Sequence, residues 1–172
     1  MLALFALLLA GCDAGPAATP VGNAVAAPVS TSYPALTGRV VDGAELLDDQ
    51  TEARISSQSE ALEAATGNQF VTVTVPTLGG QSIEEFGLAL GRQWGIGRAE
   101  HDDGILLIVA PTERRVRIEV GYGLEKTMTN ARAQTIIDDR ILPRFGEGRM
   151  QDGIVAGTDA IVSVLADKEV AK

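Results

Sequence analysis

The chain is poor in the residues on which much metal and redox chemistry depends. It contains one cysteine and one histidine in 172 residues. A single cysteine excludes a disulfide within the chain and any zinc or iron–sulfur site built from several cysteines. A single histidine excludes the zinc motif HExxH, which needs two. Several large classes of enzyme are therefore excluded before any motif is considered.

Basic charge is also scarce. The sequence has 14 Lys and Arg residues against 23 Asp and Glu, a net charge of -9 at pH 7. A general nucleic-acid binder needs a basic face to displace counterions, and an electrostatic hold on anionic lipid needs one as well. We therefore expect no nucleic-acid partner. Hydrophobic residues make up 45% of the chain, which is enough for a packed core, and the length suits one ordinary domain.

The N-terminus has the pattern of an export signal. Residues 1–11 are apolar and uncharged, too short a run for a bilayer span of about 20 residues, but typical of a secretory signal peptide. The letters LAGC at residues 9–12 resemble the lipobox of bacterial lipoproteins, whose cysteine is lipidated and becomes the mature N-terminus. We expect lipid on Cys12, and Asp13 favours the periplasmic side of the inner membrane. The alternative is a buried apolar segment with an inert cysteine.

Residues 12–36 have the composition of a tether. They are rich in Ala, Pro, Thr, Val and Ser, and Asp13 is their only charged residue. Such a stretch cannot bury enough surface to fold. The sequence therefore predicts a signal peptide over 1–11, a lipidated and disordered tether over 12–36, and one globular domain over 37–168.

The domain alternates helical and extended patterns. Asp48 or Asp49 can cap a helix that has Ile55, Leu62 and Ala65 on its inner face, and Ser82 with Glu85 forms a capping box for another. The order βαβαββαα predicts an α/β sandwich with a mixed sheet. The expected strands are 40–41, 69–75, 104–110 and 116–120, and the expected helices are 48–67, 82–94, 130–141, ended by Pro143, and one through 154–165.

The connections between these elements bring distant loops together. Strands 69–75 and 104–110 are joined by a helix and should run parallel, whereas a short turn makes 116–120 antiparallel to 104–110. The end of strand 116–120 therefore returns to the start of strand 104–110. This return places the loop of residues 121–125 beside residues 101–104.

One edge of the sheet thus gathers oxygen-bearing side chains from two loops and from the start of the next helix, those of Asp102, Asp103, Glu125 and Asn130. Oxygen ligands without histidine or cysteine suit a hard cation such as calcium, so these residues are candidate metal ligands. In the structural alternative, the two aspartates shape a turn, Asn130 caps a helix and Glu125 is solvated. On the residues alone the structural alternative is favoured.

The same edge carries two weaker signals. The loop Gly121-Tyr122-Gly123 lacks the GxGxxG pattern of a dinucleotide site, and we interpret it as a tight turn that needs positive φ. His101 is interpreted as an exposed turn residue, since no nucleophile is tied to it by sequence. No catalytic residue is assigned.

Taken together, these segments resemble the TPM domain family. The resemblance covers about residues 38–165 and implies a three-layer αβα sandwich with a mixed, mostly parallel central sheet, located outside the cytoplasm. The motifs that carry it are TGNQFVTVTVP at 66–76, SIEEF at 82–86, WGIG at 94–97, DGILLIVA at 103–110, RRVRIEVGYGLE at 114–125 and PRF at 143–145.

The resemblance also implies candidate functions. Family members include a thylakoid-lumen protein of photosystem repair with reported acid phosphatase activity and a modulator of a worm acetylcholine receptor, and calcium binding occurs in the family. Where the family commonly has Asp after the glycine loop, this chain has Asn130. The loss of a charge should weaken cation binding. Many bacterial members continue into a transmembrane helix, and here lipid on Cys12 is expected to supply the anchor.

We therefore expect a lipid-anchored, extracytoplasmic and noncatalytic helper in membrane-protein assembly, repair or envelope maintenance. It would bind calcium and an envelope or inner-membrane protein. The alternatives are a metal-dependent acid phosphatase and a ligand-free protein-interaction domain. The sequence itself supports phosphatase chemistry poorly, because it has no Cys-x5-Arg motif, no Asp-x-Asp pair and one histidine.

Overall fold

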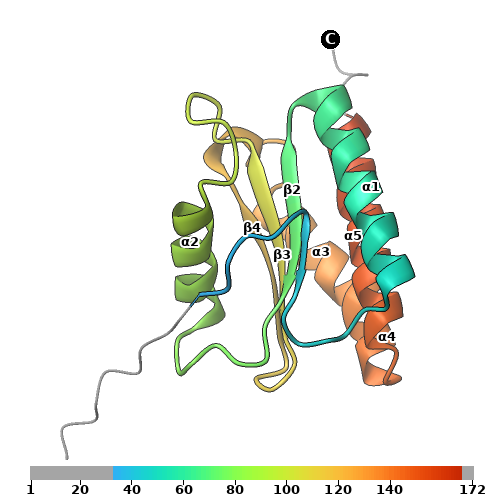
Figure 1. Ribbon diagram of the computed structural model, residues 1–172. Coiled ribbons are helices and arrows are strands. Elements are labelled where there is room, and N and C mark those ends of the chain that lie inside the picture. Colours follow the sequence, from blue (N-terminus) through green and yellow to red (C-terminus); the bar gives the residue numbers. More distant parts are fainter. Residues whose placement is uncertain (1–32, 168–172) are drawn as a thin grey trace, which may run out of the picture.

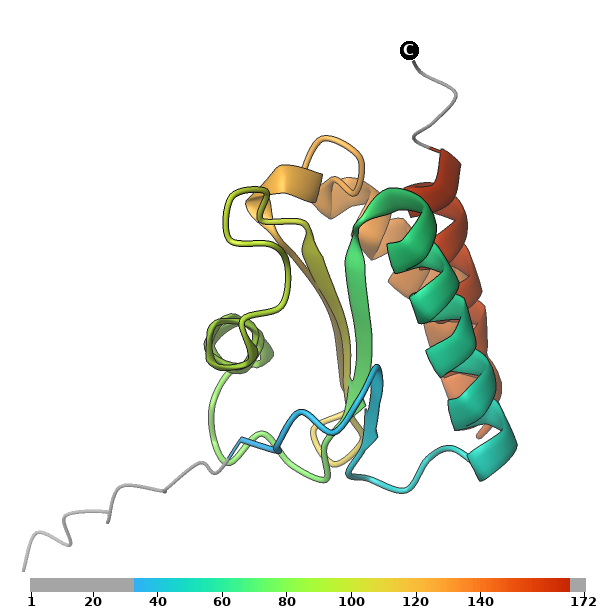
Figure 2. The ribbon, with the colours of Figure 1, turned by 45° about the horizontal axis from the view of Figure 1, so that its top comes forward.

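The computed structural model describes residues 33–167, which form three layers around one sheet (Figure 1). Helix α2 covers one face of the sheet, and α1 and α5 cover the other, as the turned view in Figure 2 shows. The predicted αβα sandwich is confirmed. The elements are β1 (Val40–Asp42), α1 (Asp49–Thr66), β2 (Gln69–Thr74), α2 (Ile83–Trp94), β3 (Gly104–Ala110), β4 (Arg115–Val120), a 3-10 turn (Tyr122–Leu124), α3 (Asn130–Ile136), a π-helical segment (Ile137–Ile141), α4 (Leu142–Gly146) and α5 (Met150–Ala166).

The sheet is mixed and mostly parallel, as expected. Its strand order is β1-β2-β3-β4, with β1, β2 and β3 parallel and β4 antiparallel to β3. Every residue of β3 is buried, which matches its uninterrupted apolar sequence and its position between two covered faces.

Two hydrophobic cores lie on opposite faces of the sheet because alternate strand residues point in opposite directions. Leu107 of β3 faces α1 and α5, whereas Leu106 and Ile108 face α2. The first core contains Ile55, Leu62, Phe70, Ile105, Leu107, Val109, Ile154, Ile161 and Leu165, and the second contains Val71, Val73, Leu78, Ile83, Phe86, Leu90, Leu106 and Ile108.

Local signals set the ends of the first two helices. The Asp48 side chain accepts a hydrogen bond from the Thr51 N–H (2.7 Å), and Ser82 with Glu85 forms the predicted capping box. Gly67 ends α1 with a φ of 77°. Within α1, Ile55 and Leu62 are buried as predicted, but Ala65 is exposed. At 100° per residue, Ala65 is turned roughly 80° away from Ile55, so it leaves the inner face.

Pro143 does not end the helix that precedes it, contrary to expectation. Helix α3 widens into the π-helical segment, in which the Leu142 N–H donates to the Ile137 carbonyl, and α4 continues directly. Pro143 then lies in the first turn of α4. A residue in that position needs no N–H donor within the helix, so proline is tolerated there.

The packed domain begins before the predicted boundary at residue 37. The Tyr33 ring lies 5.1 Å from that of Phe86, its hydroxyl donates to Gln81 Oε1 (3.1 Å), and Trp94 Nε1 donates to the Pro34 carbonyl (2.9 Å). Among residues 33–167, no helix is long and apolar enough to cross a bilayer. The signal peptide, Cys12 and most of the tether lie outside the described residues and stay predictions.

Candidate functional site

A groove of about 540 Å³ lies between α2 and the β3–β4 side of the sheet. Its walls are formed by α2 and by Arg117 and Glu119 of β4. The loops that follow α2 and β4 form its rim, which includes Asp102, Tyr122, Glu125 and Asn130. The groove is thus located at the sheet edge where the connections between the elements predicted a site.

Small residues on α2 leave this space open. Gly87, Gly91 and Gly95 recur at intervals of four, so they lie along one side of the helix, and all three line the groove. A Cβ on Gly87 would lie 2.9 Å from Ile108 Cδ1, so the helix runs close to the sheet at that level, whereas a Cβ on Gly91 would make an ordinary contact of 3.6 Å with Leu106 Cδ1. Longer side chains at these positions would fill the groove.

Backbone hydrogen bonds join the two rim loops. The Gly121 N–H donates to the Gly104 carbonyl (2.8 Å), and the Gly123 N–H donates to the Asp102 carbonyl (3.1 Å). These bonds confirm the predicted approach of residues 121–125 to residues 101–104. The contact is close, because a Cβ on Gly121 would lie 2.1 Å from the Asp102 carbonyl oxygen and one on Gly123 would lie 1.8 Å from that of His101.

The expectation of positive φ in the Gly121-Tyr122-Gly123 loop is wrong. Gly121 is extended, with a φ of -65°, and Gly123 is not among the residues with positive φ. The two glycines are required by the narrow space beside the backbone of His101 and Asp102, and not by their own dihedral angles. Tyr122 between them is 74% exposed and lines the groove.

Asp103 is separated from the other candidate ligands. Its side chain is buried, and its Oδ1 accepts from the Arg98 N–H (2.7 Å) while its Oδ2 accepts from Arg98 Nε (2.7 Å) and Nη2. Burial raises the pKa of this carboxyl, but the hydrogen bonds and charge of Arg98 outweigh it and hold the pKa below its ordinary value. Both oxygens serve to fold the loop of residues 98–103, and Asp103 does not line the groove.

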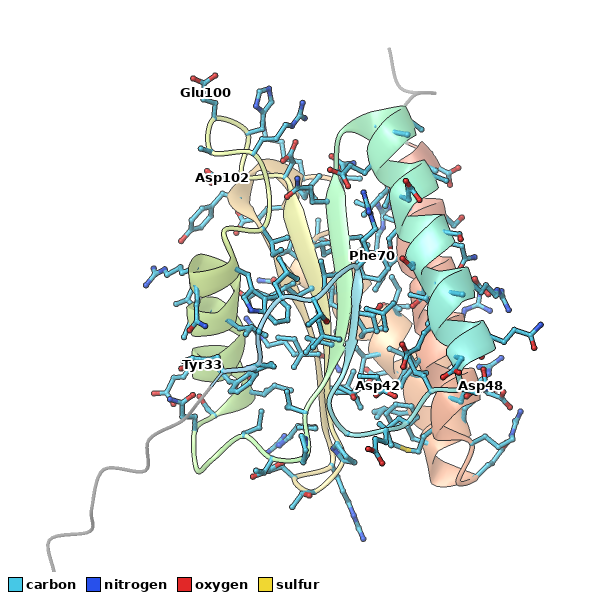
Figure 3. All side chains as sticks on the ribbon, in the orientation of Figure 1. Tyr33, Asp42, Asp48, Phe70, Glu100 and Asp102 are labelled. Carbon is cyan, nitrogen blue, oxygen red and sulfur yellow. The ribbon has the colours of Figure 1, made fainter. Side chains whose placement is uncertain are left out.

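The three remaining candidates line one groove, and all three are exposed. Asp102 has a φ of 47°, a left-handed conformation that aspartate tolerates, and it follows the exposed His101. Asn130 is the first residue of α3, whereas Thr129 caps the helix by accepting from the Arg132 N–H (3.2 Å). The alternative in which Asn130 serves as the helix cap is therefore wrong. Figure 3 shows Asp102 on its loop at the end of the sheet opposite Tyr33.

The donor set suits a weakly held hard cation. Within the described part of the chain, no three acidic, histidine or cysteine side chains are placed to share one ion. Asp102 and Glu125 offer two carboxylates to the groove and Asn130 offers an amide oxygen. Calcium takes six to eight oxygens, so backbone carbonyls and water would have to complete the shell. With only two carboxylates among the ligands, the affinity for calcium should be weak.

Basic side chains also reach this groove. Arg117 Nε donates to Glu119 Oε2 (2.5 Å), and its Nη1 lies 3.8 Å from Glu84 Oε1. Arg92, in the last turn of α2, is exposed and lines the same space. Neither Arg92 nor Arg98 belongs to the site residues that the sequence predicts. The glycine repeat of α2 is visible in the sequence as a four-residue spacing, and this spacing is the signal that could have indicated the groove.

Comparison with known proteins identifies relatives of this fold. The family model described as TPM domain matches residues 40–164. The N-terminal domain of a P. gingivalis protein, solved by solution NMR, is 36% identical, with a TM-score of 0.71, and the match covers 77% of this chain and 84% of that one. A comparison with curated proteins found no match.

Two more distant structures share the fold. The N-terminal domain of a Corynebacterium glutamicum protein is 14% identical with a TM-score of 0.59, and the match covers 78% of this chain and 84% of that one. A protein from the psychrophilic bacterium Bizionia argentinensis is 17% identical with a TM-score of 0.61, and the match covers 72% and 83% of the two chains. Two of the three structures are isolated N-terminal domains in solution, so this fold is stable on its own.

Proposed function

Because the chain belongs to the TPM domain family, we propose that it is a lipid-anchored domain of the bacterial envelope that binds a hard cation. In this role it is a noncatalytic helper in membrane-protein assembly, repair or envelope maintenance. The observation that carries the proposal is the groove, where Asp102 of the α2–β3 loop meets Glu125 and Asn130 of the connection from β4 to α3. Calcium held there would tie the rim loops together and present a defined surface to a protein partner.

The location rests on the N-terminal sequence. The apolar residues 1–11 and the cysteine at position 12 support export and lipid attachment. Anchoring keeps the domain near membrane proteins, which suits a helper that acts on them. An envelope or inner-membrane protein is accordingly the proposed partner.

Thermal melting of residues 30–172 tests the cation site. We expect calcium to raise the melting temperature above its value in chelator, because a ligand at ten times its dissociation constant adds about 1.4 kcal/mol to the free energy of unfolding. Asp102→Asn and Glu125→Gln should abolish the rise, whereas Glu60→Gln, an exposed acid on α1, should leave it unchanged. Asp103 variants are unsuitable probes because they break the pairing with Arg98.

The outcomes separate the alternatives. A calcium-specific rise that is lost in both groove variants supports the site. Melting that is indifferent to calcium and magnesium at millimolar concentration contradicts it and favours the ligand-free interaction domain. The helper role is tested by recovery of membrane proteins with the anchored chain: it predicts a partner that is lost with Asp102→Asn and with Glu125→Gln, and kept with Glu60→Gln.

One observation favours the phosphatase alternative. Arg92 and Arg117 line the groove together with Asp102 and Glu125, so cationic groups and a cation could meet one phosphoryl group there. Release of phosphate from a simple phosphate ester, lost in Asp102→Asn and reduced in Arg92→Gln, would establish this function. Activity that survives both changes would come from another site or a contaminant.

A further inference from the structure

Strand β4 presents an open row of backbone hydrogen-bonding groups. The bond from the Gly121 N–H to the Gly104 carbonyl fixes the alternation of the β3–β4 ladder, in which Arg117 and Glu119 are hydrogen-bonded to β3. The N–H and C=O groups of the residues that alternate with these two therefore point away from the sheet. These residues are Val116, Ile118 and Val120, and none of them forms a hydrogen bond on that side within residues 33–167.

This edge lacks two of the usual obstacles to strand pairing, a bulge and a proline. The register of β4 with β3 is unbroken from Arg115 to Val120, without a bulge, and the strand contains no proline or glycine. The opposite edge is β1, which spans three residues. The longer edge of the sheet is therefore also the regular one, which makes it the better template for another strand.

The sequence of β4 is complementary to itself about Ile118. If a second copy runs antiparallel with the two Ile118 residues opposite each other, Arg117 of each copy lies opposite Glu119 of the other. Val116 then lies opposite Val120. The Arg117 and Glu119 positions would form non-hydrogen-bonded pairs, in which cross-strand side chains are closest and opposite charges attract.

The surroundings of the edge fit this arrangement. Arg117 and Glu119 lie on the α2 face with side chains 33% and 18% exposed, and they already pair with each other within one copy. A second copy would extend this pair into a ring of four alternating charges. Leu88 of α2 is 42% exposed and lines the groove beside Arg117, so the approach of a second molecule would cover an apolar side chain.

We propose that a second copy of this chain adds to the sheet at β4, antiparallel and centred on Ile118. The Ile118–Ile118 pair and the two Val116–Val120 pairs would each exchange two backbone hydrogen bonds, and one sheet would continue across both molecules. The grooves of the two copies would flank the interface, because Arg117 and Glu119 line them. This pairing does not depend on a cation or on the groove being occupied.

Sedimentation equilibrium of residues 30–172 tests the pairing through its charges. The wild type should form a dimer, and Arg117→Glu should weaken it at least about tenfold, because the change places like charges opposite each other and symmetry creates two such pairs. The double variant Arg117→Glu/Glu119→Arg should restore the dimer, since opposite charges again face each other. Arg54→Glu on α1 makes the same charge change on another layer and should have no effect. A thermal melt of each variant verifies folding.

Disulfide formation tests the register. Residues 30–172 contain no cysteine, so the single variants Arg117→Cys and Glu119→Cys can be mixed and oxidised. The mixture should cross-link far more than either variant alone, because the two positions face each other at about 4.5 Å between Cα atoms, within the range of a disulfide. The proposal is overturned by a wild type that stays monomeric at millimolar concentration. It is equally overturned if the dimer affinity is the same in the wild type, in Arg117→Glu and in the double variant. Cross-linking that is no greater in the mixture than in either cysteine variant alone would also overturn it.

Discussion

Asp102 and Asp103 are adjacent in the chain and lie in opposite surroundings. Asp102 is exposed at the rim of the groove, whereas Asp103 is buried and bonded to Arg98 through both carboxylate oxygens. We expect Asp103→Asn to lower the free energy of unfolding by about 2 kcal/mol, because it removes charged hydrogen bonds from a buried position. Asp102→Asn should change it by less than about 0.5 kcal/mol. Urea denaturation of both variants measures the difference.

The same contact predicts a dependence on pH. The pKa of Asp103 is lowered in the folded state from its ordinary value of 3.8. A lowered pKa contributes stability that is present above the ordinary value and is lost as the pH falls through the folded-state value. The stability gap between wild type and Asp103→Asn should therefore be constant near neutrality and shrink below about pH 4. A gap that stays constant into strong acid would contradict this account of the ion pair.

Asn130 offers a gain of function at the residue scale. It supplies an amide at a position where a carboxylate would add charge to the groove. If the proposed site exists, Asn130→Asp should tighten calcium binding about tenfold, because affinity rises with the number of charged ligands. Calorimetric titration of residues 30–172 measures the affinity, and Asp138→Asn, an exposed change on the π-helical segment, is the control. An unchanged affinity in Asn130→Asp would remove this residue from the site.

At the scale of elements, α2 combines glycines with opposite requirements. A Cβ on Gly91 meets Leu106 Cδ1 at an ordinary 3.6 Å, so Gly91→Ala should stabilise the domain by about 0.5–1 kcal/mol through lower backbone entropy in the unfolded chain. Gly95 ends the helix with a φ of 61°, so Gly95→Ala should destabilise it by about 1 kcal/mol. Thermal melting distinguishes the two. Destabilisation by Gly91→Ala would show that α2 cannot accept even a methyl group toward the sheet.

Most elements could be predicted because their signals are local. The capping box at Ser82, the glycine stop at Gly67 and the apolar run of β3 each act within one element. The approach of the rim loops also followed from strand directions, which depend only on the connections. Pro143 could not be placed correctly from the sequence because a π-helical segment precedes it, and residue preferences do not encode that change of hydrogen-bond pattern.

The site was only half predictable for a related reason. The sequence predicts four oxygen-bearing side chains at one edge of the sheet, but it does not show that the carboxylate of Asp103 forms an ion pair with Arg98. That contact depends on how tightly the loop of residues 98–103 turns. The loop glycines were identified for the wrong reason, because their requirement arises from the distant backbone of His101 and Asp102 and not from their own φ.

At the scale of the whole molecule, the described chain begins far from the groove rim. Tyr33 packs on Phe86 and Gln81 near the start of α2, whereas the rim loops follow the end of α2 (Figure 3). A lipid attached before residue 33 would therefore be connected to the domain at the end remote from Asp102. The rim lies at the end of the domain remote from the point where the tether joins it, which leaves the rim open to a protein partner.

This orientation matters only if Cys12 carries lipid, which can be tested directly. We expect a fatty-acid analogue supplied to cells to label the full chain. Cys12→Ala should abolish the label, because the cysteine sulfur is the attachment atom and the chain has no other cysteine. We expect the wild type in the detergent-soluble membrane fraction and expect the variant to be depleted from it. Ser30→Ala, downstream of the signal, is the matched control and should keep the label. Equal labelling of wild type and Cys12→Ala would exclude the lipid anchor and, with it, the proposed orientation of the groove.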